Sequence, residues 1–174
     1  MVADSPDFAD KRESGRRVGE FAIAQLDRNL RLSSWRDVKC CAIDDTLSTA
    51  AQIMWDNDVG AVPVVDEEGR ICGMVTDRDI CMTAYLRGIL LTGAAVSTAM
   101  AKPVFSCSPE DDVHDAEKLM REKQLRRLPI VDAHGRVAGI ISIADIARWT
   151  QQETRVPTEA ELTRVMASVC ARRR

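Results

Sequence analysis

The fold is decided by the stretch Gly73-Met74-Val75-Thr76-Asp77-Arg78-Asp79-Ile80 and by a second copy of it, Gly139-Ile140-Ile141-Ser142-Ile143-Ala144-Asp145-Ile146. In each copy a short apolar run leads into a helical pattern, with a hydroxyl residue at the junction and an aspartate three residues after it. The surrounding residues repeat at the same separation of 66 positions, as Gly73 and Gly139 do. Other matched pairs are Met54 with Met120, Pro63 with Pro129, Asp66 with Asp132, and Gly69 with Gly135. No gap is needed to align the copies, so the sequence predicts an internal duplication.

Length and composition narrow the class of protein. A chain of 174 residues is long enough to bury a core, and its 45% hydrophobic and 29% charged residues are typical of a soluble globular protein. The net charge is −3 and the one long basic run is Arg172-Arg173-Arg174, which argues against a nucleic-acid-binding protein that neutralises phosphates. No segment has the character of a transmembrane helix or a signal peptide, so we expect no membrane partner and a cytoplasmic location.

The sequence shows neither a catalytic motif nor a metal motif. The six cysteines have no Cys-x-x-Cys spacing, and His114 and His134 have no partner at the spacing of a triad or metal site. No phosphate-binding loop or dinucleotide fingerprint is present. We therefore expect a protein that is not an enzyme and that requires no cofactor or metal. A thiol- or metal-responsive stress protein remains an alternative, because thiol reactivity depends on exposure and pKa.

Each copy predicts the same order of elements, strand-helix-strand-strand-helix, and we call residues 30–88 repeat one and residues 89–150 the linker and repeat two. The strands expected in repeat one are 38–42, 61–65 and 71–75, with helices at 47–57 and 77–86. The elements expected in repeat two are strands 104–107, 128–131 and 137–142, a helix opening at 109–112 and running to 123, and a helix at 143–150. Pro63 suggests a sheet edge or the start of a strand, and Gly69 is expected in a hairpin turn. The segment 88–100 is too apolar for a flexible linker, so the halves are expected to pack together as a mixed α/β (α+β) fold with a pseudo-twofold.

Two further segments flank the duplicated core. Residues 1–13 are polar and predicted to be disordered. Residues 14–29 predict an amphipathic helix that must place its apolar face against the body or a partner. Residues 157–171 predict a second such helix, opened by a capping box at Thr158 and Glu161. The apolar faces of the two helices comprise Val18, Phe21, Ala22, Leu26 and Leu30 in the first, and Leu162, Val165, Met166 and Val169 in the second.

The order of elements, the apolar-x-Pro-x-Val-Asp strand and the motif Gly-x-x-(Thr/Ser)-x-x-Asp-Ile resemble the cystathionine β-synthase (CBS) domain. The tandem resembles a CBS pair, or Bateman module, of the small stand-alone bacterial kind, over residues 30–150. This resemblance implies a regulatory module that binds an adenosine-containing ligand (AMP, ADP, ATP or S-adenosylmethionine) in clefts between the repeats. It also implies a disc-like homodimer and, because no effector domain is visible, a separate target protein that reads the ligand state.

The resemblance assigns roles to individual residues. It places ribose hydroxyls on Asp79 and Asp145, and phosphate on Thr76 and Ser142. It places adenine against main chain at Cys40, Cys41, Ala61 and Val62 in one cleft, and at Ser106, Cys107, Arg127 and Leu128 in the other. Independently of the resemblance, a helix N-terminus attracts anions, and the side chains of Arg78, Arg126 and Arg127 would add charge for a polyphosphate. The clefts should differ, since Ala144 matches Arg78 and Gly60-Ala61 matches the arginine pair.

Two interpretations of these motifs remain open. A hydroxyl residue followed three residues later by an acid is also a helix capping box, which stabilises a helix start without any ligand. Arg126 and Arg127 would equally flank a hairpin in solvent. If the clefts bind nothing, the tandem would be a ligand-free dimerisation or interaction module.

Overall fold

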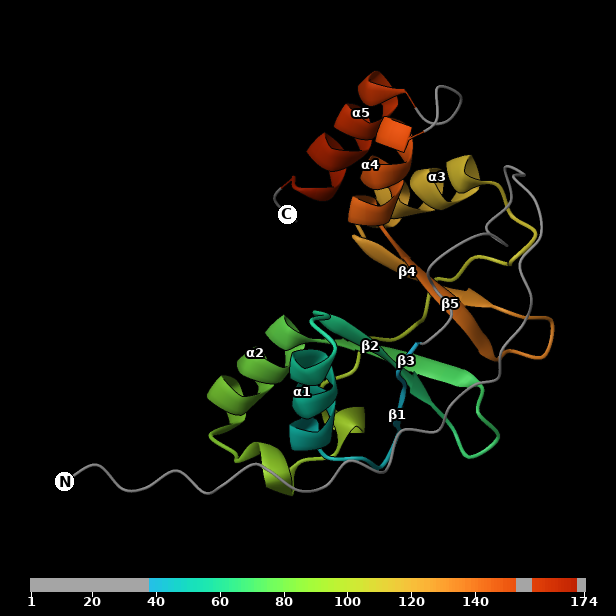
Figure 1. Ribbon diagram of the computed structural model, residues 1–174. Coiled ribbons are helices and arrows are strands. Elements are labelled where there is room, and N and C mark those ends of the chain that lie inside the picture. The colour runs from blue at the N-terminus through green and yellow to red at the C-terminus, as the bar shows by residue number, and fades with distance from the viewer. Residues whose placement is uncertain (1–37, 153–157, 172–174) are drawn as a thin grey trace.

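The computed structural model describes residues 38–152 and 158–171, with two lobes that correspond to the two repeats (Figure 1). The predicted disordered segment 1–13 and the predicted helix 14–29 lie outside the described residues. Each lobe carries a small sheet with helices on one side (Figure 1). The mixed α/β fold predicted from the duplication is thereby confirmed.

Repeat one is built around a three-stranded sheet. Its strands are β1 (Cys41–Ala42), β2 (Ala61–Val65) and β3 (Ile71–Thr76), in the order β1-β2-β3, with β1 parallel and β3 antiparallel to β2. The helix α1 (Leu47–Asp56) connects β1 to β2, and α2 (Asp77–Arg87) follows β3. The predicted strand 38–42 is therefore too long, because ladder pairing begins at Cys41 opposite Val64.

Pro63 lies inside β2, the middle strand, so the prediction of a sheet edge or strand start is wrong. Pro63 is opposite Met74 in β3, and Met74 forms both of its backbone hydrogen bonds with Ala101 on its other side. The two residues thus form a pair without mutual hydrogen bonds. The strand interior tolerates a proline there because no ladder bond to β3 requires its missing N–H.

Repeat two has α3 (Val113–Lys123), β4 (Arg127–Val131), β5 (Val137–Ser142) and α4 (Ile143–Gln152). The predicted first strand, 104–107, is wrong: the pairing is limited to a single bridge between Cys107 and Ile130. The chain turns directly afterwards, where the Ser108 N–H donates to Asp111 Oδ2 at 2.8 Å. The helix predicted to open at 109–112 begins at Val113 instead, because Asp112 is its N-cap.

Backbone conformation repeats along with the sequence. Gly69 and Gly135, at matched positions in the two hairpins, have φ of 78° and 79°. Asp58 and Gln124, which are also matched, have φ of 51° and 53° although neither is glycine. Positive φ at the same two positions of each repeat indicates that the duplication extends to the turns between elements.

The two repeats have separate hydrophobic cores. Leu47, Val62 and Val75 are fully buried in repeat one, where Ala94 and Val96 of the segment between the repeats join them. Met120 is among the fully buried residues of repeat two. The lobes meet at their hairpins, where the Ile71 N–H donates to the Gly135 carbonyl at 2.9 Å.

The C-terminal helix α5 (Glu159–Val169) packs on α3 and α4 (Figure 1). Its predicted capping box forms between Thr158 and Glu161. Val165 and Val169 are buried in the repeat-two core, whereas Met166, predicted on the same face, is 43% exposed. Across residues 38–152 and 158–171, no helix combines the length and the apolar character that crossing a membrane requires.

Candidate functional site

The predicted motif of repeat two lies at the N-terminus of α4. The Ser142 N–H and hydroxyl donate to Asp145 Oδ2 at 2.8 and 2.5 Å, and the Asp145 N–H donates to Ser142 Oγ at 3.2 Å. The other carboxylate oxygen, Oδ1, accepts from the Arg148 guanidinium one helical turn later. The capping interaction therefore uses one oxygen of Asp145 and leaves the other for a different partner.

Repeat one builds the same cap at the start of α2. The Thr76 N–H and hydroxyl donate to Asp79 Oδ2 at 3.0 and 2.6 Å, and the Asp79 N–H donates back to Thr76 Oγ1 at 3.2 Å. Met82 matches Arg148, so Asp79 Oδ1 has no hydrogen-bond partner among the described residues. The cap thus uses Oδ2 of each aspartate and not Oδ1, so the capping interpretation of the motif does not exclude the binding interpretation.

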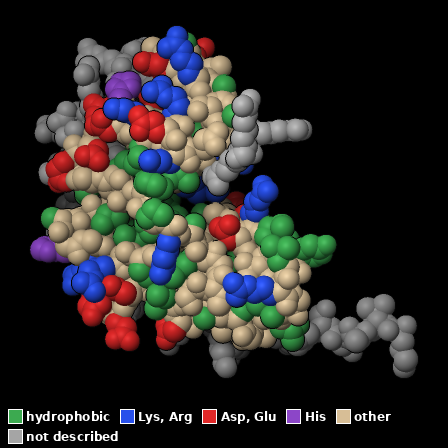
Figure 2. Space-filling view, turned by 180° about the vertical axis from the view of Figure 1, so that it is seen from behind, with side chains coloured by type: hydrophobic (Ala, Val, Ile, Leu, Met, Phe, Trp, Pro, Cys, Tyr) green, Lys and Arg blue, Asp and Glu red, His purple; other side chains and the backbone are tan. Residues whose placement is uncertain are grey.

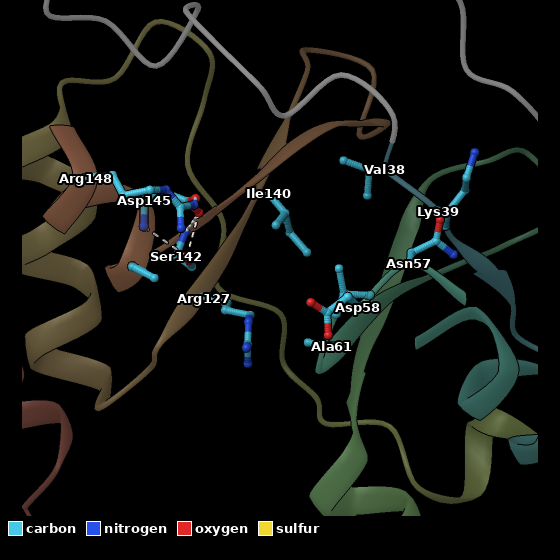
Figure 3. Close-up of a pocket in the computed structure, with 12 residues that line it drawn as sticks. Val38, Lys39, Asn57, Asp58, Ala61, Arg127, Ile140, Ser142, Asp145 and Arg148 are labelled. Atoms are coloured by element: carbon cyan, nitrogen blue, oxygen red, sulfur yellow. Dashed lines mark hydrogen bonds and ion pairs between the residues drawn. The ribbon is translucent and has the colours of Figure 1, made fainter. Parts of the chain in front are cut away.

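A cavity of about 360 Å³ lies where the repeat-two motif faces repeat one. Figure 3 shows Ser142 and Asp145 on one side of it and Val38 on the other, with Ile140 and Arg127 between them. Ala61, at the start of β2, completes the repeat-one wall. The volume falls within the range of about 300–1,000 Å³ that small-molecule sites occupy.

The lining of this cavity combines apolar surface with charge of both signs. The anionic lining residues are Asp58 and Asp145, and the cationic ones are Lys39, Arg127 and Arg148. The apolar lining residues are Val38, Val59, Ala61, Ile140 and Ala144. A flat apolar ring with an anionic group is the kind of ligand that such a surface suits, because guanidinium groups bind phosphate in a bidentate manner.

Of the predicted site residues, the cavity brings together Ala61, Arg127, Ser142 and Asp145. The other predicted residues do not line it: Cys40, Cys41, Val62, Thr76, Arg78, Asp79, Ser106, Cys107, Arg126 and Leu128. The cavity therefore pairs the motif of one repeat with the lead-in and the α1–β2 loop of the other.

Main-chain groups at Cys107, where adenine was expected, already have partners. Its N–H donates to the Pro129 carbonyl at 3.0 Å, and its carbonyl accepts from the Val131 N–H at 2.8 Å. Cys41 pairs with Val64 in the repeat-one sheet and is 1% exposed. These sheet hydrogen bonds reduce the main-chain donors and acceptors that a base could use at the two positions.

Sequence reasoning missed several residues of the cavity. Arg148 was detectable, since a residue three positions after Asp145 on a helix lies on the same face. Ile140 lies within the second copy of the motif, 139–146, but the motif does not show that its side chain faces the cavity. Asn57 and Asp58 carry no motif at all, and they reach the cavity because of the turn between α1 and β2.

Four of the six thiols are in surroundings that disfavour the reactive thiolate. Burial raises the pKa of Cys40 to about 11 and of Cys41 and Cys107 to about 12, and it raises the pKa of Cys72 as well. A sensor thiol requires a lowered pKa and access to solvent. Only Cys81 and Cys170 of the six are exposed.

Comparison with known proteins gives a consistent result. The family model described as CBS domain matches residues 31–84 and 96–151. The chain is 33% identical over 111 residues to hypoxic response protein 1 of Mycobacterium tuberculosis, which covers 64% of this chain and 77% of that protein. It is 41% identical over 105 residues to the CBS domain-containing protein YhcV of Bacillus subtilis, which covers 60% of this chain and 72% of that one.

Two solved structures have folds similar to that of this chain. Hypoxic response protein I with two coordinated zinc ions has a TM-score of 0.60 at 31% identity, covering 69% of this chain and 92% of that one. CBSX2 in complex with AMP shares the fold, with a TM-score of 0.59 at 24% identity, covering 68% and 90% of the two chains. In the part of this chain that the structure describes, no three His, Cys, Asp or Glu side chains are grouped to hold a metal such as that zinc.

Proposed function

Because the chain belongs to the CBS domain family, we propose that it is a non-catalytic regulatory module that binds an adenosine-containing ligand between its two repeats. The observation that carries the proposal is the position of Asp145 and Ser142 across the cavity from Val38 and Ala61. The candidate ligands are AMP, ADP, ATP and S-adenosylmethionine. The AMP complex of CBSX2 supports this ligand class, as a property of a protein with the same fold.

In the proposed complex, Asp145 Oδ1 accepts hydrogen bonds from the ribose hydroxyls. An ionised carboxylate accepts from two vicinal hydroxyls, and Oδ2 remains in the helix cap. Arg148 now occupies Oδ1, so ribose binding requires its guanidinium to share that oxygen or turn outward. Its side chain is 65% exposed, so it has room to do so.

The base and the phosphate have distinct surroundings in this arrangement. The adenine ring lies against the apolar side chains of Val38, Ala61 and Ile140. The phosphate lies at the N-terminus of α4, beside the Ser142 hydroxyl and the Arg127 guanidinium. All of these groups come from two different repeats, so the bound ligand favours one relative arrangement of the halves, and a separate target protein reads that population shift.

Isothermal titration of the full chain with AMP, ADP, ATP and S-adenosylmethionine tests the proposal. One of the four should bind with micromolar affinity, and at a hundred times its Kd it should stabilise the fold by about 2.7 kcal/mol. No heat and no stabilisation with any of them would leave the motifs as helix caps and the chain as an interaction module. Light scattering on the same samples tests the homodimer that the family resemblance predicts.

A further inference from the structure

The two repeats differ at one junction, where the residue before the hairpin contacts the start of the helix that follows it. In repeat two, the Ile143 N–H of α4 donates to the Arg126 carbonyl at 3.0 Å, and the Ile143 side chain is buried in the core. In repeat one, the Asp77 N–H of α2 donates to the Gly60 carbonyl at 3.4 Å. The backbone contact is thus duplicated, whereas repeat one has an exposed carboxylate where repeat two has a buried isoleucine.

Gly60 makes room for charged groups from both repeats. A Cβ on Gly60 would lie 3.2 Å from Asp77 Oδ2 and 3.4 Å from Arg127 Nη2. Because both atoms lie close to the same point beside the Gly60 backbone, the carboxylate of repeat one and the guanidinium of repeat two are neighbours across the junction. In Figure 2, acidic and basic side chains lie next to one another where the two lobes meet. The absence of a side chain at Gly60 is what allows these two groups to approach each other.

Arg127 faces two separate hollows of the molecule. One is the cavity between the repeats, and the other is a groove of about 690 Å³ between α1 and α2, which Asp77 also lines. In Figure 3 the Arg127 guanidinium points away from Ser142 and Asp145. It forms no hydrogen bond or ion pair with any residue that the structure describes. The guanidinium thus lies between two anionic positions, the Asp77 carboxylate and the proposed position of the ligand's phosphate.

We propose that Asp77 is a positioning residue for Arg127 and that it competes with the phosphate of the ligand for the guanidinium. This inference rests on the proposed function, because it concerns the phosphate position of that site. A guanidinium binds a carboxylate and a phosphate in the same bidentate geometry, so it does not serve both fully at once. Asp77 therefore weakens the binding of phosphorylated ligands and leaves the binding of a phosphate-free nucleoside unchanged.

The competition acts in both directions. Phosphate binding weakens the attraction between Arg127 and Asp77 by the same factor by which Asp77 weakens phosphate binding. Asp77 is the first residue of α2, where its Oδ1 accepts from the Arg78 N–H at 2.7 Å. A phosphate bound beside the repeat-two motif thus changes the charge at the start of a repeat-one helix, and the other repeat responds to the phosphorylation state of the ligand.

Calorimetric titration of the full chain with ATP and with adenosine tests the proposal. We expect Asp77→Asn to lower the Kd for ATP about three- to fivefold, the effect that an exposed ion pair supports, and to leave the Kd for adenosine unchanged. In an Arg127→Ala background the same substitution should not affect ATP binding. Asp56→Asn is the control, since it removes the same charge from an exposed residue that lines neither the cavity nor the groove. A purely structural role at the start of α2 would not separate ATP from adenosine.

Other results would overturn the proposal. A Kd for ATP that Asp77→Asn leaves unchanged, or lowers equally without Arg127, would show that Asp77 does not act through the guanidinium. A larger gain from Asp58→Asn would assign the competition to Asp58, the other carboxylate that lines both the cavity and the groove.

A second readout uses the chain without ligand. The NMR signal of the Arg127 Nε–H should shift in Asp77→Asn and not in Asp56→Asn. If ATP binds the unmodified chain and this signal does not shift, the role of Asp77 alone is refuted. If ATP does not bind the unmodified chain, the proposed nucleotide and the competition for it are refuted together, even where the signal shifts.

Discussion

Arg127 of repeat two lies beside Gly60 of repeat one, where a Cβ on Gly60 would come within 3.4 Å of Arg127 Nη2. The same Cβ would come within 3.2 Å of Asp77 Oδ2, at the start of α2. Arg127 also lines both the cavity between the repeats and the groove between α1 and α2. The side chain of Arg127 therefore lies between the two repeats, at the proposed ligand site.

Removal of this arginine should weaken the binding of phosphorylated ligands. We expect Arg127→Ala to raise the Kd for ATP about tenfold, equivalent to about 1.4 kcal/mol, because a charge-assisted hydrogen bond is lost. The neighbouring Arg126→Ala is the control, since Arg126 does not line the cavity. If calorimetry gives Kd values that rise by the same factor for both variants, the cause is general electrostatic attraction and not a site at Arg127.

Arg148 should affect nucleotides and nucleosides differently. In Arg148→Met, which copies Met82 of repeat one, Asp145 Oδ1 no longer has a competing cation. We expect the Kd for adenosine to fall or stay constant and the Kd for ATP to rise, because only the phosphates gain from the guanidinium. A rise of similar size for both ligands would contradict this division of roles.

The contribution of α5 to stability can be measured with two adjacent residues. Val165 is 3% exposed and Met166 is 43% exposed. We expect Val165→Ala to lower the free energy of unfolding by about 2 kcal/mol, because it leaves a cavity in the repeat-two core. Met166→Ala should change it by no more than about 0.5 kcal/mol. Urea denaturation of the two variants gives both values, and equal losses would mean that α5 does not pack through Val165.

Glu117, buried beside α5, should make stability depend on pH. Burial raises the pKa of Glu117, although His114 Nδ1 lies 3.2 Å from Oε2 and favours the charged form. Among the described residues, Glu117 Oε1 has no hydrogen-bond partner. The folded state therefore binds the proton more tightly than the unfolded state, and the carboxylate destabilises the fold above its raised pKa.

We expect Glu117→Gln to raise the free energy of unfolding at pH 8. This gain should shrink as the pH falls through the raised pKa toward 4.5, the ordinary value for a glutamate. Urea denaturation at several pH values provides the measurement, with Glu122→Gln on the exposed face of α3 as the control. A gain that does not change with pH would show that charge is not the cause.

The sequence predicts most of the fold because the duplication repeats its turns and its capping residues. Thr76 and Thr158 begin helices through local hydrogen bonds, and the glycines at 69 and 135 adopt positive φ in hairpin turns. These local preferences can be recognised in a single sequence. The first strand of repeat two was predicted wrongly because 104–107 has an apolar strand pattern, whereas pairing depends on where the chain turns at Ser108. Met166 was placed on the buried face because periodicity does not give the width of the contact.

The candidate site was predictable only in part. The motif identified Ser142 and Asp145 as a helix start suited to an anion, and the structure places both at a cavity. The partners of that motif come from the other repeat, through Val38, Asp58 and Ala61. Contacts between repeats depend on how the lobes pack, and a pattern within one repeat carries no information on that.

Calorimetric titration of Asp145→Ala and Asp79→Ala with the ligand that binds the full chain tests the central claim most directly. Each variant loses the same kind of capping box, at a cost of about 1 kcal/mol, so the two are matched for stability. We predict that Asp145→Ala weakens binding at least about tenfold, because it removes the proposed ribose acceptor, and that Asp79→Ala leaves the Kd almost unchanged. Unchanged binding by Asp145→Ala would contradict a ligand site between Asp145 and the repeat-one wall.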